Sequence, residues 1–193
     1  MHTRSWVVLP TTAAAALLLV SCDGPARIAE PPRLSAVTAA PQYSASPDEH
    51  PVEMLDQCDP ATFNAAIGPG TCLSAHPGFS FSSFIDQLTR MQNAPAWRNA
   101  PSALSLAFGT TLRAVNRGGE VHTFTRVAAF GGGVVPLLNA LAGTPVPAPE
   151  CLAAPPDEFL PPGGVDEDVV TTHGTALYQC CIHPWMRTTV AVR

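Results

Sequence analysis

Residues 178–193, YQCCIHPWMRTTVAVR, determine how the rest of the chain is interpreted. Within this stretch Cys180, His183 and Met186 recur at every third position, as Cys-x-x-His-x-x-Met. One short loop therefore brings together a thiolate, an imidazole and a thioether, which suit a soft metal and copper above all. Two imidazoles and a thiolate in a trigonal plane, with a weak thioether on the axis, make a type 1 copper site. The loop supplies all of these ligands except one histidine.

The missing imidazole is predicted at His122. Residues 116–125, NRGGEVHTFT, predict a turn that leads into a strand, and His122 lies where the two meet. Cys180 ends another predicted strand, and its loop turns back into a strand predicted over residues 188–192. Two such segments can meet at one end of a β-sandwich, so that ligands from both sheets hold the metal.

The composition indicates one ordinary domain with appendages. Of the 193 residues, 46% are hydrophobic, which is enough for a buried core. Twenty-one prolines and fourteen glycines indicate many turns and argue against a helical bundle. The net charge is −5 and basic runs are missing from the sequence, so no binding to nucleic acid is expected. Six cysteines favour an oxidising compartment.

The N-terminal part of the chain is predicted to lie outside the folded domain. Residues 1–21 have a basic residue followed by an apolar run, which is typical of a signal peptide. The run ends at Cys22 in a sequence that resembles the bacterial lipobox, and this resemblance implies a lipid on the cysteine. The alternative is an ordinary secretory signal in which the cysteine occurs by chance. Asp23 resembles an inner-membrane retention signal, so we expect an anchor on the periplasmic side. Residues 22–57, rich in Pro, Ala and Ser, predict a disordered tether.

Short alternating segments predict strands in the remaining domain, residues 58–193. Ser83 and Asp86 fit a capping box, and the apolar residues that follow predict one helix that ends near Asn93. Residues 134–168 are proline-rich and predict a long insertion. These patterns favour an all-β fold, a Greek-key β-sandwich with one short helix and a long proline-rich insertion. The predicted strands cover residues 102–108, 112–115, 122–130, 169–172, 175–181 and 188–192.

The ligand loop and the turn before it resemble those of the cupredoxins, the plastocyanin and amicyanin group. The sequence HPWMR at 183–187 is most similar to amicyanin, whose ligand loop is among the shortest. Asn116, five further residues and His122 match the asparagine, turn and first histidine ligand of that group. Thr123 stands where many members have an asparagine that hydrogen-bonds the cysteine sulfur. The resemblance implies one type 1 copper ion bound by His122, Cys180, His183 and Met186.

The other cysteines are predicted to form two disulfides. Cys58 and Cys72 enclose a short loop and are the local pair. Adjacent strand residues point to opposite faces, so Cys181 should face away from the metal if Cys180 binds it. Cys151 is then the remaining partner for Cys181. The alternative is that Cys180 and Cys181 both form disulfides and no copper binds, or that the site binds zinc.

The resemblance implies a one-electron carrier outside the cytoplasmic membrane, with unidentified redox partner proteins such as a cytochrome, an oxidase or a reductase. A catalytic role is not expected, because four protein ligands would leave the copper no open position for a substrate. We start from a monomer that contacts the membrane only through its lipid. Two alternatives are a copper-delivery protein without a relay role and a metal-free cupredoxin-like module. Trp185 is predicted to shield the site, with an exposed edge of His183 as the exit for the electron.

Overall fold

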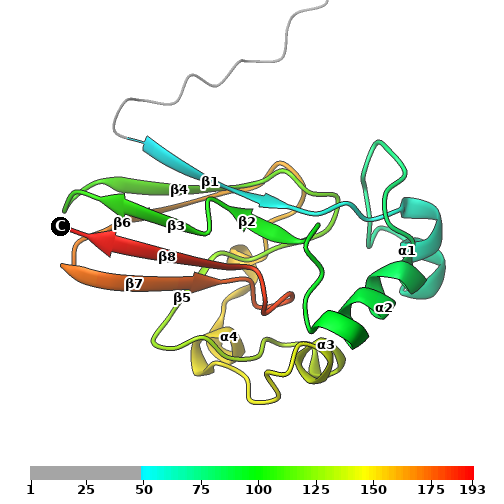
Figure 1. Ribbon diagram of the computed structural model, residues 1–193. Helices are drawn as coiled ribbons and strands as arrows, with labels where there is room; N and C mark the ends of the chain where they lie inside the picture. The colour runs from blue at the N-terminus through cyan, green and yellow to red at the C-terminus, as the bar shows by residue number, and fades with distance from the viewer. Residues whose placement is uncertain (1–48) are drawn as a thin grey trace, which may run out of the picture. The chain divides into compact units, whose positions relative to one another are not determined.

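The computed structural model describes residues 49–193, which form two four-stranded β-sheets packed around a common core (Figure 1). The first sheet has the order β2-β1-β4-β6 and the second the order β3-β8-β7-β5. The predicted all-β sandwich is therefore confirmed. The strands of the first sheet are β1 (Glu49–Leu55), β2 (Arg98–Ala100), β4 (Thr111–Asn116) and β6 (Val165–Val169). Those of the second are β3 (Ala103–Leu106), β5 (Thr125–Val127), β7 (Gly174–Gln179) and β8 (Arg187–Val192).

The two sheets are mixed, because the chain repeatedly crosses from one to the other. Strand β1 pairs with β4 in parallel, and β3 pairs with β8 in parallel, whereas the other neighbours are antiparallel. Parallel neighbours need a crossover connection instead of a hairpin. The antiparallel pairing of β5 with β7 brings together the segment before β5 and the segment after β7, although they lie far apart in the sequence.

The core follows from the two-residue period of the strands. In β8 the buried residues are Thr188, Val190 and Val192, while their neighbours are partly exposed. In β1 the same alternation buries Val52 and Met54 completely. Side chains of this size each contribute about 1.5–3 kcal/mol when fully buried. The two sheets are thus held by inward-facing rows from strands near both ends of the domain.

Strand β1 corrects the predicted domain boundary. Residues 49–57 were predicted to belong to the tether, but residues 49–55 form a central strand between β2 and β4. The local sequence did not predict this strand, because Pro51 and the surrounding charged residues are of types that are uncommon in strand interiors. The folded domain therefore begins before Cys58. The signal peptide, Cys22, Asp23 and the tether before residue 49 lie outside the described residues.

The structure has more helices than the single one predicted. That helix is α2 (Phe81–Met91), and its cap is Ser80, whose side chain accepts a hydrogen bond from the Ser83 N–H. The predicted capping box began three residues too late, because Ser83 itself lies inside the first turn. Helix α2 ends at Gln92, which has a φ of 55°. The others are α1 (Pro60–Ala66), α3 (Pro136–Leu141), α4 (Pro149–Ala153) and the 3-10 helix η1 (Pro156–Glu158).

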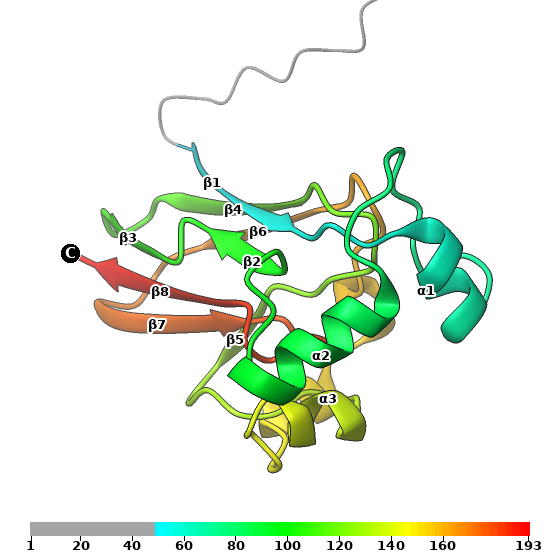
Figure 2. The same ribbon diagram turned by 45° about the vertical axis from the view of Figure 1, so that its right-hand side comes forward.

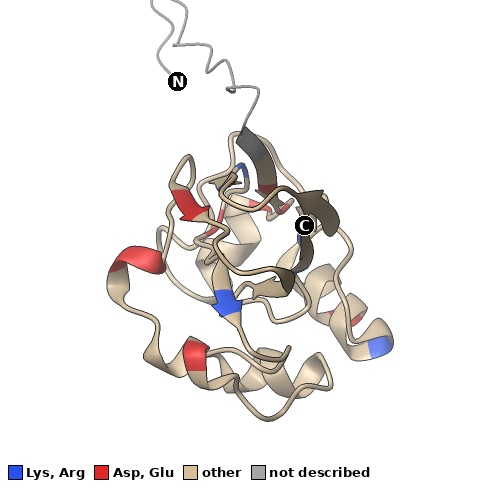
Figure 3. Cartoon of the chain, turned by 90° about the vertical axis from the view of Figure 1, so that its left-hand side faces the viewer, with Lys and Arg blue, Asp and Glu red and all other residues tan. Residues whose placement is uncertain are grey.

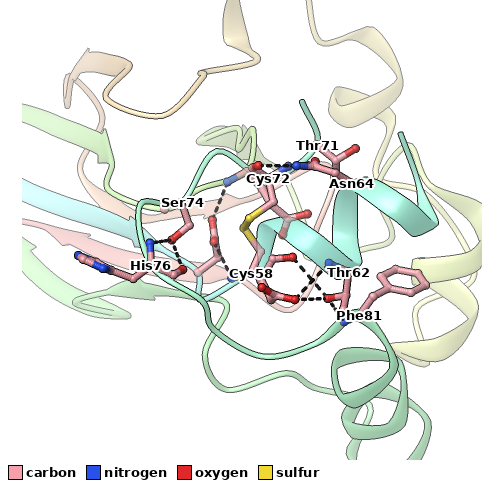
Figure 4. Close-up of a disulfide and its surroundings, with 12 residues drawn as sticks. Cys58, Thr62, Asn64, Thr71, Cys72, Ser74, His76 and Phe81 are labelled. Atoms are coloured by element: carbon pink, nitrogen blue, oxygen red, sulfur yellow. Dashed lines mark hydrogen bonds between the residues drawn. A yellow bond between two sulfur atoms is a disulfide. The ribbon is translucent and has the colours of Figure 1, made fainter. Parts of the chain in front are cut away.

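Helix α1 occupies the loop between Cys58 and Cys72, and these two cysteines form a disulfide, as predicted (Figure 4). Asp59 caps the helix by accepting a hydrogen bond from the Thr62 N–H. The Asn64 side chain donates to the Cys72 carbonyl at 3.0 Å and accepts from the Cys72 N–H at 2.9 Å. Helices α1 and α2 lie together at one end of the sandwich, opposite the end where the C-terminus emerges (Figures 1 and 2).

The predicted insertion, residues 134–168, is ordered. It contains α3, α4 and η1, and it ends in β6, which lies four residues earlier than the strand predicted at 169–172. Strand β6 has the sequence VDEDV, and its three acidic residues, a type uncommon in strands, did not predict a strand there. As an edge strand it tolerates these charges, which also discourage pairing with another chain. Charged residues are otherwise sparse on the domain (Figure 3). None of the helices within residues 49–193 is long and apolar enough to cross a membrane.

Candidate metal centre

The strand register brings the predicted ligands together. Thr125 of β5 lies opposite Gln179 of β7, so His122, just before β5, approaches Cys180, just after β7. A pair of hydrogen bonds fixes the backbone of His122. Its N–H donates to the Leu160 carbonyl at 3.1 Å, and the Leu160 N–H donates back at 2.8 Å. The insertion therefore supports the first histidine directly.

The turn before His122 is closed by the side chain of Asn116. Its amide group donates to the carbonyls of Glu120 and Leu160, both at 2.8 Å, and its carbonyl accepts from the Gly118 N–H at 2.9 Å. Asn116 is fully buried, so these bonds satisfy its polar atoms. This is the physical role of the asparagine in the predicted Asn-x5-His pattern.

The ligand loop 180–186 is closed by its own backbone. The Cys180 N–H donates to the Met186 carbonyl at 3.0 Å, and the Met186 N–H donates to the His183 carbonyl at 2.9 Å. Pro184 has no N–H to donate, and its carbonyl accepts a 2.7 Å hydrogen bond from Arg187 Nε. The loop is thus a compact turn that leads directly into β8.

Three potential ligand atoms converge in the interior of the protein. The Cys180 Sγ atom lies 3.8 Å from His122 Nδ1 and 3.7 Å from His183 Nδ1. Metal bonds of about 2.0 Å to nitrogen and about 2.3 Å to sulfur, opened to a trigonal angle, would separate sulfur and nitrogen by about 3.8 Å. All three side chains are buried. The donor set and its spacing therefore fit a soft metal ion in a trigonal plane.

Met186, the fourth predicted ligand, is fully buried and belongs to the same core cluster as Cys180. The structure therefore brings His122, Cys180 and His183 together and buries Met186 in the loop that carries two of them. Cys180 is also the free cysteine among residues 49–193. A thiol that takes part in no disulfide is available as a ligand.

The sulfur of Cys180 receives two backbone hydrogen bonds. The N–H groups of Thr123 and His183 lie 3.4 and 3.5 Å from it. Although burial opposes ionisation, hydrogen bonds and charges from His122 and His183 hold the pKa of the Cys180 thiol well below its usual range. The Thr123 hydroxyl does not contact the sulfur; it accepts a 2.8 Å hydrogen bond from the Cys181 N–H. Thr123 thus links the two ligand segments through its backbone and its side chain.

Asp56 is a contact of the site that the sequence analysis did not identify. Its Oδ2 atom lies 2.9 Å from His122 Nε2, and both side chains are completely buried. Burial opposes ionisation of Asp56, but hydrogen bonds from His122 and from the Glu120 N–H lower its pKa to about 2. Burial likewise disfavours the charged form of His122, yet the bonds to Asp56 and Cys180 raise its pKa to about 9. Asp56 could not be found from spacing, because it lies 66 residues from its partner.

The second imidazole also faces an acidic side chain. Glu120 Oε2 lies 3.6 Å from His183 Nε2 and accepts a 2.5 Å hydrogen bond from Trp97 Nε1. Burial raises the pKa of Glu120, which the charge of His183 and the bond from Trp97 only partly offset. His183 is only 3% exposed, so the predicted exposed edge of this histidine is wrong. Phe84 of α2 and Trp185 of its own loop pack against its ring.

An apolar cavity of about 290 Å³ lies beside His183. Phe63 and Phe81 line it on the α1 and α2 side, Leu138 lines it on the α3 side, and Glu120 and His183 contribute the polar part of its wall. The side chain of Trp185 packs nearby, with ring centroids 5.5 Å from His183 and 6.0 Å from Phe84. This side of the site is therefore water-poor and rich in aromatic rings.

Cys181 faces away from Cys180, as the alternation of strand residues predicts. It forms a disulfide with Cys151 of α4, and the pair belongs to a separate small core with Val127 and Ala148. Gly133, directly before the insertion, passes so close that a Cβ atom there would lie 1.8 Å from the Cys181 carbonyl oxygen. The insertion is thus attached to the back of the ligand strand.

No protein-family model matches the chain, and no curated protein matches its sequence. Among solved structures it is similar to a purple cupredoxin from Nitrosopumilus maritimus, with 25% identity over 52% of this chain and 86% of that chain and a TM-score of 0.37. It is also similar to a copper(I) form of an amicyanin variant, with 20% identity over 50% and 73% of the two chains and a TM-score of 0.35. Oxidised plastocyanin from Dryopteris crassirhizoma is 14% identical over 75% of this chain and all of its own (100%), with a TM-score of 0.38. The chain's own strand order and core give it a cupredoxin-like β-sandwich fold.

Proposed function

We propose that the protein binds one type 1 copper ion through His122, Cys180, His183 and Met186 and carries single electrons outside the cytoplasmic membrane. The observation that supports this most directly is the position of two imidazole Nδ1 atoms at 3.7 and 3.8 Å from a free, buried cysteine sulfur. A low thiol pKa favours the thiolate, which is the form that binds metal. Bound copper would supply the one-electron couple.

The residues of the site are suited to electron transfer because hydrogen bonds of the surrounding backbone hold them in place. Backbone hydrogen bonds close the loop from Cys180 to Met186, and β-bridge contacts fix His122. A cage with little freedom to rearrange keeps the same geometry in both oxidation states, so that the reorganisation needed for transfer is small. The buried ligands also exclude water. These side chains would therefore bind and orient the metal and would take part in no covalent reaction step.

We propose that the electron passes between the site and the surface on the side of the apolar cavity, instead of through an exposed histidine edge. His183 lines this cavity, and Trp185 and Phe84 pack against its ring. The partner at this surface is proposed to be another redox protein, such as a cytochrome, an oxidase or a reductase. Its position there would bring it near His183 without opening the metal site to water.

The location outside the cytoplasmic membrane is supported by the sequence of the leader and by two disulfides. A lipid on Cys22 and the segment that follows it would hold a monomeric domain near the periplasmic face of a membrane. The same location would give access to periplasmic redox proteins. An acidic domain with few basic residues does not favour nucleic acid as a partner.

The test is copper loading of the chain from residue 23 onward, followed by absorption and electron paramagnetic resonance spectra. We expect an intense visible thiolate-to-copper band and a reversible one-electron couple. The Cys180→Ser variant should lose the band, whereas Met186→Leu should keep the thiolate band with an altered spectrum. Rapid loss of copper to a chelator without a reversible couple would favour a delivery protein. A colourless protein that takes up no copper would refute the proposal.

A further inference from the structure

The carboxylate of Asp56 is held in one orientation by several donors. Its Oδ2 atom accepts from the Glu120 N–H at 3.0 Å and lies 2.9 Å from His122 Nε2. Its Oδ1 atom accepts from the Cys58 N–H at 3.2 Å. A Cβ atom on Gly118 would lie 1.9 Å from Oδ2, so the backbone there packs directly against the carboxylate. Asp56 cannot turn away from His122 without disturbing the turn that carries this histidine.

The hydrogen bond determines which nitrogen of His122 is free. An acceptor at Nε2 requires the proton to be on Nε2, and the lone pair of the neutral ring is then on Nδ1. The Nδ1 atom faces Cys180 Sγ at 3.8 Å. Metal-binding histidines commonly donate their other N–H to a carboxylate, which orients the ring and increases its basicity. Asp56 and His122 have this carboxylate–histidine arrangement, although Asp56 lies outside the Cys-x-x-His-x-x-Met pattern.

We propose that Asp56 is a positioning residue that fixes the Nδ1-binding form of His122 and favours the oxidised form of the bound metal. This inference rests on the proposed copper site. Copper(II) carries one more positive charge than copper(I), so a buried anion near the site stabilises the oxidised form more strongly. Because Asp56 and His122 are both completely buried, solvent screens this interaction little. The carboxylate would act through its contact with His122 Nε2.

Glu120 does not have the same role at the other histidine. Its Oε2 atom is 3.6 Å from His183 Nε2, which is too long for a hydrogen bond, and its nearest donor is Trp97 Nε1 at 2.5 Å. The assignment is therefore specific to Asp56. Glu53, on strand β1 just before Asp56, provides a matched control, because its carboxylate pairs with Arg117 at 3.6 Å and is about half exposed.

The experiment compares Asp56→Asn, Asp56→Ala and Glu53→Gln with the unchanged chain from residue 23. Asparagine keeps an acceptor for Nε2 but removes the charge, whereas alanine removes both. In the copper-free protein, ¹⁵N NMR of the imidazoles should show the Nε2–H form of His122 in the unchanged chain near pH 10, above its pKa. That form should persist in Asp56→Asn and be lost in Asp56→Ala.

In the loaded protein, Asp56→Asn should shift the ratio of copper(II) to copper(I) affinity at least tenfold toward copper(I). For a one-electron couple, tenfold corresponds to a potential about 59 mV higher. Glu53→Gln should leave the potential close to that of the unchanged chain. Equal potentials for Asp56→Asn and Glu53→Gln would overturn the charge effect, and an unchanged tautomer in Asp56→Ala would overturn the positioning role.

The two proposals fail in different ways. If the unchanged chain binds no copper, the proposed function fails, while the NMR measurement on the copper-free protein still tests whether Asp56 orients His122. If Asp56→Ala does not fold, the tautomer of His122 in the unchanged chain tests whether Asp56 orients this ring. A Nδ1–H form there would contradict the orientation.

Discussion

Replacing both Cys151 and Cys181 with alanine should destabilise the domain strongly without removing the copper-binding thiolate. The disulfide closes a segment with a sequence separation of 30. The chain-entropy relation gives a stabilisation of about 3.6 kcal/mol for a loop of this length. For a domain of this size, such a loss corresponds to a melting temperature about 10 °C lower. Alanine is chosen because serine would leave buried hydroxyl groups without partners.

The spectrum of the copper-loaded double variant tests the more specific part of this reasoning. Cys181 and Cys151 pack in a core separate from that of Cys180, and Cys181 contacts Thr123 only through its backbone N–H in the described contacts. Alanine keeps that N–H. The thiolate-to-copper band should therefore be preserved at temperatures below unfolding.

Urea unfolding followed by circular dichroism would measure the stability change, with Cys58→Ala/Cys72→Ala as the matched control. The control disulfide has a sequence separation of 14, for which the same relation gives about 3.0 kcal/mol. A folded Cys151→Ala/Cys181→Ala protein that has lost its thiolate band would refute the assignment of opposite roles to the two adjacent cysteines. Unchanged stability would refute the structural role of the bond.

Three further predictions follow from contacts of the site. Gly118→Ala should reduce stability by about 1–3 kcal/mol and weaken copper binding, measured by urea unfolding and copper titration, because the new Cβ would meet the Asp56 carboxylate. Trp185→Gln should keep the copper spectrum but slow reduction by a protein donor in stopped-flow measurements; an unchanged rate would place the route elsewhere. In the copper-free protein, the raised pKa of His122 gives stability that is lost as pH rises from about 6.5 to about 9, whereas the lowered pKa of Cys180 gives stability that grows as pH rises, so the two contributions should partly cancel in the free energy of unfolding. In Cys180→Ser the bond from His122 to Asp56 remains, so a reduced His122 contribution should be present below about pH 6.5 and decline as pH rises; a flat profile in this variant would contradict it.

The features that could be predicted from the sequence are those with local spacing. Cys180, His183 and Met186 lie on one loop, so their separation alone suggested a common site. The two disulfides followed from one short loop and from the alternation of strand residues, which gives Cys180 and Cys181 opposite faces. The strand predicted at residues 188–192 lies within β8.

The features that were missed depend on contacts across long stretches of chain. Strand β1 is stabilised by pairing with β2 and β4, more than forty residues later, and its own sequence has a proline and two acidic residues. Asp56 follows this strand and was assigned to the tether with it. Helix α1 is short and begins at a proline after an aspartate, which also fits a simple turn. In each case the local sequence was compatible with a loop, and only tertiary packing selects the structure.

The elements that were not predicted supply charged and aromatic groups around the two histidines of the site. Residues 49–97 supply the carboxylate at His122 Nε2 and aromatic rings of α1 and α2 beside His183, whose own Nε2 faces Glu120. A site built from residues 101–193 alone, which the sequence resemblance describes, would lack the carboxylate at His122 and these rings beside His183. Because these residues bring acidic groups and apolar rings together, they affect both the charge around the metal and the route by which an electron reaches it. The N-terminal third of the domain is therefore part of the metal centre and not an accessory to it.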